Sequence, residues 1–545
     1  SSISFSDEIS NNENIEADVI ILGCSLPGIV TAHKLKSKFG DAMDIVVLDL
    51  GRSRYMSKCN VAFQEQRDDE DPIPTEHRFD GAAKEVIDSV ARHYLVKYTR
   101  EFNIPIPESI ISTQPIPTSL HKLFQYTNGS TVQCTKDYHD FDYLNIVEKF
   151  ELTQYQTLLD QSIGDLFQVN KEDTEAERKK LLYYDQTTME KHICDALFFP
   201  TSREIMRMTV RLVCGSSADT VSVLFYLHQC YRTNSSRNHL DGDNTRFREK
   251  LLGYCRKHLA HKLQQSIADI TLPAKSITEI RTYSREQVIL ETMKGENNYV
   301  CNLLAMALRP DELRHIRVET QLLAEREVTM AQAMKPGRAK KFLVQYEENF
   351  WRSNGYSGDI LSIRGPIIWA MERPKMSTTG SLEKYSSLVG YLLIRDDDSY
   401  DSQAAVVDQL VKLFGPKAAS PANYTETDVA DIFVPRCGDY VALRKWTEVG
   451  SPRHLEWGAL DIFADGDVAA ALEAGHRAYV HLLSCLRPQA QTFEDISASE
   501  WPTRLCDDPL KRWLAYMNYM RTLRFAAYTA VVYIGVRLLR AFMRK

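Results

Sequence analysis

The sequence predicts an α/β fold, because its opening residues alternate between buried strands and a helix. Residues 18–22 (DVIIL) and 45–48 (IVVL) are short apolar runs, which are typical of strands covered on both faces. Between them, residues 27–39 read as a helix, and Pro27 suits the first turn of a helix. A strand–turn–helix–strand unit of this kind predicts a parallel sheet with right-handed crossovers.

Length and composition indicate a globular protein with more than one core. The chain has 545 residues, which at roughly 100–200 residues per domain predicts two or three domains or one large interleaved one. Hydrophobic residues make up 44% and charged residues 26%, which excludes a mostly disordered chain. The 11 cysteines include no C-x-x-C pair, which favours a reducing compartment over disulfides or structural zinc. The polar, acidic residues 1–17 predict no secretory signal.

The middle of the chain predicts helices first and strands later. A helix is expected near residues 80–102, and Thr187 with Glu190 forms a capping box for the next helical stretch. Ser216 is the expected cap of a helix over 219–230. The other expected elements are a basic helix at 247–267, strands at 288–292, 299–306, 342–350, 358–368 and 388–394, a loop at 415–428, a helix at 468–483 and a linker from 484.

The turn after the first strand resembles a phosphate-binding turn. A dinucleotide fold has G-x-G-x-x-G at this point, and the chain has GCSLPG, with Gly23 and Gly28 in place and Ser25 in the middle position. Asp49 ends the second strand, where an acidic residue can bind ribose hydroxyls. Two interpretations stay open: a nucleotide site, or a β–α–β unit that has lost its ligand.

Residues 509–545 are predicted to associate with a membrane. They contain basic residues and no Asp or Glu, whereas the whole chain has a formal charge of −7, and an acidic body gives no support for nucleic-acid binding. Within them, residues 525–536 are uncharged, which is shorter than the about 20 residues of a spanning helix. A tail anchor with snorkelling arginines, a helix on the membrane surface and a packed C-terminal helix are all possible. The basic flanks favour an anchor in the mitochondrial outer membrane, facing the cytosol, with the endoplasmic reticulum as the alternative.

Four segments, in their order and spacing, resemble the flavin-dependent amine oxidases, and specifically the monoamine oxidases with their C-terminal membrane tail. They lie at 17–35, 183–230, 336–351 (PGRAKKFLVQYEENFW) and 463–478 (FADGDVAAALEAGHRA). The resemblance implies an α/β fold in which a dinucleotide-binding (FAD-type) domain is interleaved with an α+β substrate domain. It also implies hydride removal from an amine by flavin, then imine hydrolysis and reoxidation by oxygen to give peroxide. The implied division is a flexible N-terminus at 1–16, FAD-binding segments at 17–100, 235–310 and 430–483, substrate-domain segments at 101–234 and 311–429, a linker at 484–508 and a membrane helix at 509–545.

The resemblance also implies roles for individual residues. Lys341 lies where the family keeps a lysine that holds a water near flavin N5, and the alternative is an ordinary lysine at a strand start. Tyr440 lies where the family places one wall of an aromatic cage for the substrate amine, and the alternative is a packed tyrosine. No metal site is expected. The residues expected to hold FAD, without a covalent bond, are Gly23, Ser25, Gly28, Asp49, Arg52, Gly466 and Val468.

Several positions around the cofactor depart from the family pattern. Residues 50–54 hold one glycine where the family has a pair, and residues 247–250 are bulky or charged where it has a glycine-rich loop. Asp439 stands where some members bond a cysteine to flavin. Ala430 and Asp467 stand at aromatic positions, and Asp467 would also cap the helix that points at the flavin. The chain has only 24 glycines, few for an FAD cradle.

The sequence therefore leaves two functions open. The first is a membrane-anchored, FAD-dependent oxidase that acts on an amine. The second is a catalytically impaired or inactive relative that acts as a binding or scaffold protein, with a protein partner or a second copy of itself. The losses around the cofactor favour the second, although a shared fold does not fix function.

Overall fold

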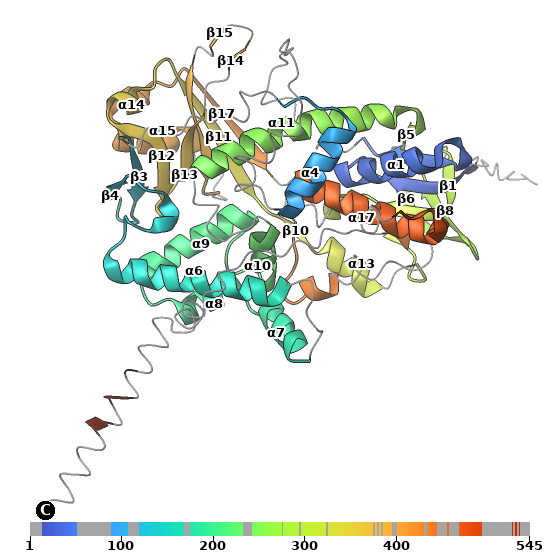
Figure 1. The fold of residues 1–545 in the computed structure, drawn as a ribbon, viewed down its shortest axis with the longest axis horizontal. Coiled ribbons are helices and arrows are strands. Elements are labelled where there is room, and N and C mark those ends of the chain that lie inside the picture. The colour runs from blue at the N-terminus through green and yellow to red at the C-terminus, as the bar shows by residue number, and fades with distance from the viewer. Residues whose placement is uncertain are drawn as a thin grey trace, which may run out of the picture.

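The computed structural model contains two large β-sheets with a layer of helices between and below them (Figure 1). The residues that the structure describes are 14–51, 89–106, 119–167, 175–232, 242–274, 276–293, 296–322, 325–373, 377–378, 381–382, 385–394, 401–429, 433–443, 455–456, 468–492, 526, 529–530 and 533–534.

The first sheet contains the opening β–α–β unit. Its strand order is β5 (Thr271–Pro273), β2 (Ile45–Asp49), β1 (Asn14–Leu22), β8 (Asn298–Met306), β7 (Gln287–Thr292), β6 (Ile277–Ser284) and β9 (Arg317–Val318), and β19 (Leu455–Glu456) also pairs with β8. β1 runs parallel to both neighbours, with Val19 opposite Ile45 on one side and Leu303 on the other. The predicted α/β fold is confirmed. The strands around β1 are parallel as expected, but β7 pairs antiparallel with β8 and β6, so the sheet as a whole is mixed.

Helices cover one face of this sheet. They are α1 (Leu26–Phe39), α4 (Ser89–Glu101), α11 (Gly242–Ser266) and α17 (Val468–Leu486), and Figure 1 shows them together. Val19 and Ile21 of β1 pack in the core under these helices, whereas Ile20 and Leu22 face the core on the other side. Because both faces of β1 are covered, the strand is apolar without alternation.

The contact between α1 and α17 joins two helices that lie more than 400 positions apart in the sequence, one near each end of the described residues. The Thr31 hydroxyl donates to the carbonyl oxygen of Gly475 at 3.0 Å. A Cβ atom at Gly475 would lie 2.5 Å from the carbonyl oxygen of Pro27. Glycine at this position therefore lets the two helices approach more closely than any other residue would allow.

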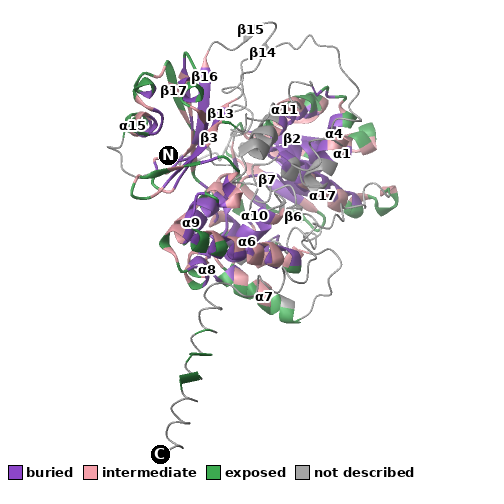
Figure 2. Cartoon of the chain, turned by 60° about the vertical axis from the view of Figure 1, so that its left-hand side comes forward, coloured by how far each residue is buried: buried purple, intermediate pink, exposed green. Residues whose placement is uncertain are grey.

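The second sheet separates a small core from a large one. Its order is β17 (Asn423–Val429), β11 (Ala339–Tyr346), β16 (Ser386–Leu392), β13 (Ile367–Arg373), β12 (Tyr356–Ser362), β3 (His121–Gln125) and β4 (Thr131–Cys134). Phe342 and Val344 of β11 face the core that includes α15 (Ser402–Phe414). Trp369 and Leu361 face the larger core on the other side. Buried residues are frequent along the central strands of this sheet in Figure 2, for example in β16.

The helical layer packs on that larger core. It comprises α6 (Ile146–Phe167), α7 (Glu175–Gln186), α8 (Met189–Ala196), α9 (Pro200–Cys214) and α10 (Val223–Arg232). The smaller elements are α12 (Pro310–Leu313), α13 (Glu325–Gln332), α14 (Phe350–Ser353), the strand pair β10 (Lys335–Pro336) and β18 (Phe433–Val434), and the strand pair β14 (Ser377–Thr378) and β15 (Ser381–Leu382).

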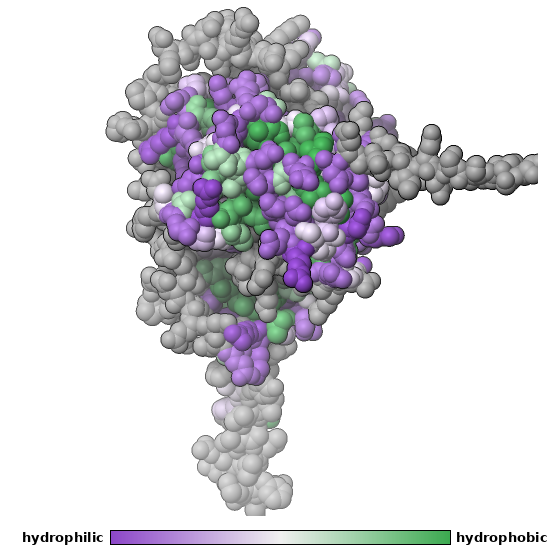
Figure 3. Space-filling model, turned by 90° about the vertical axis from the view of Figure 1, so that its right-hand side faces the viewer, coloured by the Kyte–Doolittle hydropathy of each residue, from purple (hydrophilic) through white to green (hydrophobic). Residues whose placement is uncertain are grey.

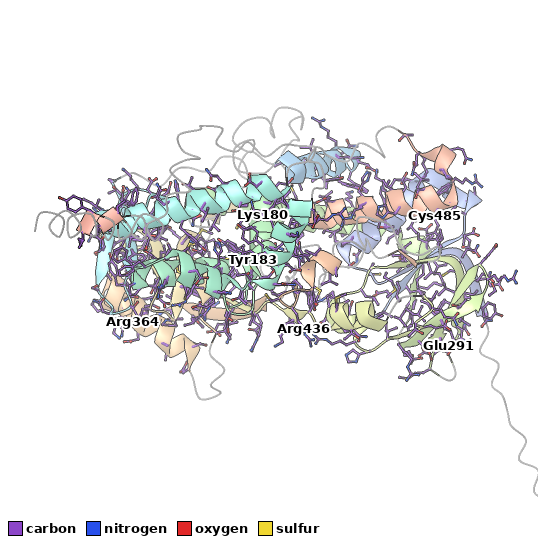
Figure 4. The ribbon with its side chains drawn as sticks, turned by 90° about the horizontal axis from the view of Figure 1, so that it is seen from below. Lys180, Tyr183, Glu291, Arg364, Arg436 and Cys485 are labelled. Atoms are coloured by element: carbon purple, nitrogen blue, oxygen red, sulfur yellow. The ribbon has the colours of Figure 1, made fainter. Side chains whose placement is uncertain are left out.

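The labelled residues of Figure 4 show how these parts follow one another. Arg364 marks the end with the second sheet, and Glu291 and Cys485 mark the end with the first. Tyr183 of α7 and Arg436 lie between them. On the face shown in Figure 3, hydrophobic areas lie among hydrophilic residues.

Two predictions about the second sheet are wrong. The expected loop at 415–428 contains β17, a strand at the edge of the sheet that pairs antiparallel with β11. Its sequence, NYTETDV, lacks an apolar run because an edge strand is only partly covered. The expected single strand at 358–368 is two strands, because Gly365 (φ +74°) and Pro366 turn the chain between β12 and β13.

The predicted helix starts are shifted. Thr188, not Thr187, caps α8, and its hydroxyl accepts the N–H of Lys191 at 3.2 Å. The expected capping box is absent because the cap is Thr188, whose third helical residue is Lys191; Glu190 pairs with Arg207. The helical stretch also breaks before Pro200. Helix α10 begins at Val223, where Ser222 Oγ accepts the N–H of Phe225 in place of the expected cap Ser216.

The predicted membrane helix is not supported by the described residues. Among them, no helix combines the length and the apolar character needed to cross a bilayer. Of residues 509–545, however, only 526, 529–530 and 533–534 are described. The tail anchor therefore stays a prediction.

Candidate functional site

The turn between β1 and α1 is shaped by contact with the segment after β8. Gly23 has φ +107°, and a Cβ there would lie 2.5 Å from the carbonyl oxygen of Ala307. A Cβ at Gly28 would lie 2.5 Å from the Cβ of Ala307. The N–H of Ala307 donates to the Leu22 carbonyl at 2.9 Å, which fixes this approach. Both glycines therefore have a packing role, whatever binds at the turn.

Ser25 occupies the N-cap position of α1. Its backbone is extended (φ −66°, ψ 157°), and its side chain makes no capping hydrogen bond. The Oγ atom is buried and has no hydrogen-bond partner in the structure as described. The first turn of α1 carries no acidic residue, so the positive end of this 14-residue helix is not neutralised from within.

Asp49 lies at the same edge, as the sequence predicts. It ends β2, and its Oδ1 accepts the N–H of Gly51 at 2.9 Å. The pKa of the nearby Cys24 thiol is raised to about 12, mainly by burial and further by the negative charges of Asp49 and Glu312. The acid of the second strand therefore faces the turn after the first strand.

These residues fit the adenosine-diphosphate half of a dinucleotide. A free helix N-terminus and an unsatisfied hydroxyl suit a phosphate, and Asp49 suits a ribose. Residues 21–30, from the end of β1 into α1, are all buried. Val468 begins α17 as expected and is buried, whereas Arg52 and Gly466 lie outside the described residues.

The segment expected near a glycine-rich loop is helical. Residues 247–250 lie inside α11, which runs without interruption from Gly242 to Ser266. A helical backbone satisfies its own N–H groups, whereas a glycine-rich loop offers them to a ligand. Ala430 and Asp467 lie outside the described residues.

Lys341 lies on the sheet face that looks toward the helical layer. It is opposite Tyr391 of β16, and Tyr391 is opposite Trp369 of β13. The Lys341 ammonium lies 5.9 Å from the centroid of the Tyr391 ring, and the Tyr391 and Trp369 ring centroids are 5.9 Å apart. The lysine is thus at the start of an aromatic row, and its role toward a flavin stays a prediction.

Tyr440 is enclosed by protein on all sides, with 2% of its surface exposed. Its hydroxyl is hydrogen-bonded to Nδ1 of His228 on α10. Its ring lies edge-on to Phe225, with centroids 5.2 Å apart. The structure thus gives Tyr440 the environment of a packed tyrosine, while the cage role that the resemblance implies stays a prediction.

Asp185, at the end of α7, fixes the backbone around Tyr440. Its Oδ1 accepts the N–H of Tyr440 at 3.3 Å, and its Oδ2 accepts the N–H of Val441 at 3.0 Å. Its carbonyl oxygen accepts the N–H of Gly438 and the thiol of Cys437. Burial raises the pKa of the Asp185 carboxyl, against the lowering effect of these backbone donors.

Neither Asp185 nor His228 was predicted as a site residue. They lie 255 and 212 positions from Tyr440 in the chain, and no local motif marks them.

Burial of the Cys437 thiol raises its pKa, so this cysteine is held as the neutral thiol beside Asp185.

Comparison with known proteins gives a consistent result. The family model for flavin containing amine oxidoreductases matches residues 109–478, more than half of the chain. The chain is 23% identical over 252 residues to "Probable flavin-containing monoamine oxidase A" of Dictyostelium discoideum, covering 45% of this chain and 53% of that protein. It is 24% identical over 255 residues to "Amine oxidase [flavin-containing] A" of Bos taurus, covering 45% and 46%. The chain thus spans about half the length of the curated relatives it matches.

Solved structures share the fold. A double mutant of putrescine oxidase, from a redesign of its cofactor binding, has a TM-score of 0.63 at 14% identity, covering 86% of this chain and 100% of that one. Cyclohexylamine oxidase from Brevibacterium oxydans has a TM-score of 0.57 at 16% identity, with the same coverage. At such low identity the likeness shows the fold alone.

Proposed function

Because this chain belongs to the family of flavin-containing amine oxidoreductases, we propose that it binds FAD without a covalent bond but oxidises amines poorly or not at all, and acts as a binding or scaffold protein. Membership of the family implies the FAD cofactor. The observation that carries the proposal is the packing of Tyr440. An aromatic cage works through the open face of a ring, whereas this ring is 2% exposed and its hydroxyl is bound to His228.

The residues at the turn after β1 and at the end of β2 support weak rather than tight binding of FAD. Gly23, Ser25 and Gly28 would approach the phosphates of FAD, and Asp49 would approach a ribose. When bound, FAD supplies the hydride acceptor for amine oxidation. The turn that would hold it is buried, as are all residues from 21 to 30, so little of its surface is accessible to a cofactor. The continuous helix α11 gives no loop donors at 247–250.

A second candidate is an active amine oxidase. It is favoured by Lys341, which lies on the face of the second sheet toward the helical layer, beside Tyr391. A lysine in such a place can donate to and position a water molecule. The substrate would be an amine; a relative of the same fold has been solved with putrescine bound.

Flavin content and peroxide release separate the two candidates. The 545-residue chain is purified in detergent, and its visible spectrum is recorded before and after denaturation and after FAD is added. Amines are then screened for peroxide, with Lys341→Met as the control variant. We expect flavin to bind and no amine to raise peroxide above the level of the control. Amine-dependent peroxide that disappears in Lys341→Met would contradict the proposal and establish the second candidate.

We further propose that residues 509–545 anchor the protein in the mitochondrial outer membrane, with the body in the cytosol. The proposal is supported by the sequence, which flanks the uncharged run 525–536 with arginines and a lysine. Replacing the basic residues after the run with uncharged ones and imaging the protein tests it. Loss of mitochondrial localisation is expected; unchanged localisation, or an endoplasmic reticulum signal in the wild type, would contradict it. The residues to replace are Arg537, Arg540, Arg544 and Lys545.

A further inference from the structure

The hydroxyl of Ser25, in the GCSLPG turn, is buried and has no hydrogen-bond partner among the described residues. A serine at an N-cap usually accepts a hydrogen bond from the second or third residue of the helix. Here the second residue is Pro27, which has no N–H, and the Ser25 side chain makes no capping bond to the third residue, Gly28, either. Ser25 is buried, with 7% of the residue exposed, and its hydroxyl has no partner among the described residues.

The two glycines of the turn are explained without a ligand. Gly23 and Gly28 each face Ala307 so closely that a Cβ would come within 2.5 Å of it. Their presence therefore follows from the packing of α1 and β1 on the segment after β8. The Ser25 hydroxyl has no such explanation, because burying an unpaired hydroxyl destabilises the folded state.

The charges around Ser25 are compatible with an anion. The helix behind it has 14 residues and no acid in its first turn. Two carboxylates influence the adjacent Cys24, those of Asp49 and Glu312. Each already accepts a backbone hydrogen bond: Asp49 from Gly51 at 2.9 Å, and Glu312 from Arg309 at 2.9 Å. Their negative charge is therefore partly compensated before a ligand arrives.

We propose that the Ser25 hydroxyl donates a hydrogen bond to a phosphate oxygen of a ligand that carries an adenosine diphosphate group. The side chain then does what the backbone does at the middle glycine of the usual turn. This inference rests on the proposed binding of FAD, and it makes Ser25 a specificity-determining residue for the diphosphate. It also reverses a simple expectation, namely that restoring the glycine would improve binding.

The test is to titrate the 545-residue chain with ADP, with adenosine and with FAD, and to measure the affinity for each ligand by isothermal titration calorimetry. The variants are Ser25→Ala and Ser25→Gly. The matched control is Ser202→Ala, because Ser202 on α9 is another fully buried serine with no partner for its hydroxyl. We expect both Ser25 variants to bind ADP and FAD about tenfold more weakly, the size expected for one hydrogen bond to a charged group. Adenosine affinity and the control should not change.

The melting temperature of the ligand-free protein provides a second measurement. If the Ser25 hydroxyl is unpaired until phosphate binds, Ser25→Ala should melt no lower than the wild type, while its stabilisation by ADP is lost. A lower melting temperature with an unchanged ADP effect would overturn the inference, because the hydroxyl would then have a structural role.

Three other results would also overturn it. They are tighter ADP binding by Ser25→Gly, equal ADP binding by Ser25→Ala, and no ADP or FAD binding by the wild type at millimolar concentration. The proposed impairment of amine oxidation is decided separately, by peroxide release, so the two conclusions can fail independently.

Discussion

The hydroxyl of Tyr440 is hydrogen-bonded to Nδ1 of His228, although 212 positions of the chain separate the two residues. Both side chains are buried, His228 at 7% exposure and Tyr440 at 2%. Together with the Asp185 carboxylate, this contact joins α7, α10 and the segment around Tyr440 into one unit. The segment around Tyr440, where the resemblance predicts one wall of an amine cage, is therefore held by interactions within the protein.

The Tyr440–His228 pair should be measurable as a coupling energy. His228→Ala leaves a buried hydroxyl without its partner and should lower the free energy of unfolding by about 2–4 kcal/mol, through lost packing and the unpaired group. Tyr440→Phe removes the hydroxyl itself and should cost about 1 kcal/mol. Urea unfolding of both single variants and the double variant gives the coupling. Simple additivity would show that the hydrogen bond contributes nothing.

Asp185→Asn should loosen the segment around Tyr440. The amide keeps one acceptor oxygen, so one of the two backbone N–H groups, of Tyr440 or Val441, loses its partner. We expect a loss of about 1–3 kcal/mol in unfolding free energy and faster hydrogen exchange at that N–H. Exchange that is unchanged at both residues would contradict the assigned contacts.

Acid sensitivity should arise where α1 meets α4. Burial tends to raise the pKa of Glu101, but hydrogen bonds from His33 and Lys34 outweigh it and lower the pKa to about 2. A carboxyl with a lowered folded-state pKa contributes stability above its unfolded value of 4.5, and loses it as the pH falls toward 2. After solvent screening this contribution is about 1–2 kcal/mol. Unfolding of the wild type and Glu101→Gln between pH 7 and 2.5 measures it, and parallel pH curves would contradict it.

Gly23→Ala should destabilise the protein more than Gly40→Ala. Both glycines have positive φ, +107° and +54°. A Cβ at Gly23 would collide with Ala307, whereas a Cβ at Gly40 would meet nothing within 4 Å. We expect losses of about 2–4 kcal/mol and about 1 kcal/mol respectively, from strain with and without a clash. Thermal unfolding of the two variants measures the effect of the contact between residue 23 and Ala307. Equal losses of stability in the two variants would show that this contact has no effect.

The part of the fold that could be predicted is the part with local signals. The apolar runs of β1 and β2, with Gly23 and Asp49 at their ends, predicted both the parallel pairing of these strands and the edge where these residues meet. Strand β17 could not be recognised because its polar sequence carries no strand pattern, and its extended structure depends on pairing with β11.

The surroundings of Tyr440 could not be predicted for a similar reason. Its position in the chain followed from a resemblance, but Asp185 and His228 reach it only through tertiary packing. A contact between residues more than 200 positions apart leaves no trace in the local pattern of either segment.

The close contact of Gly475 with the first turn of α1 also has a consequence during synthesis. β1 and α1 are made first, but α17, one of the helices that pack against them, is made only from residue 468 onward. Until then Val30 and its apolar neighbours lack the partner on which they pack in the finished protein. The core around α1 is therefore incomplete until α17 has been made. A nascent chain stalled before residue 468 would expose this incomplete core to chaperones and proteases.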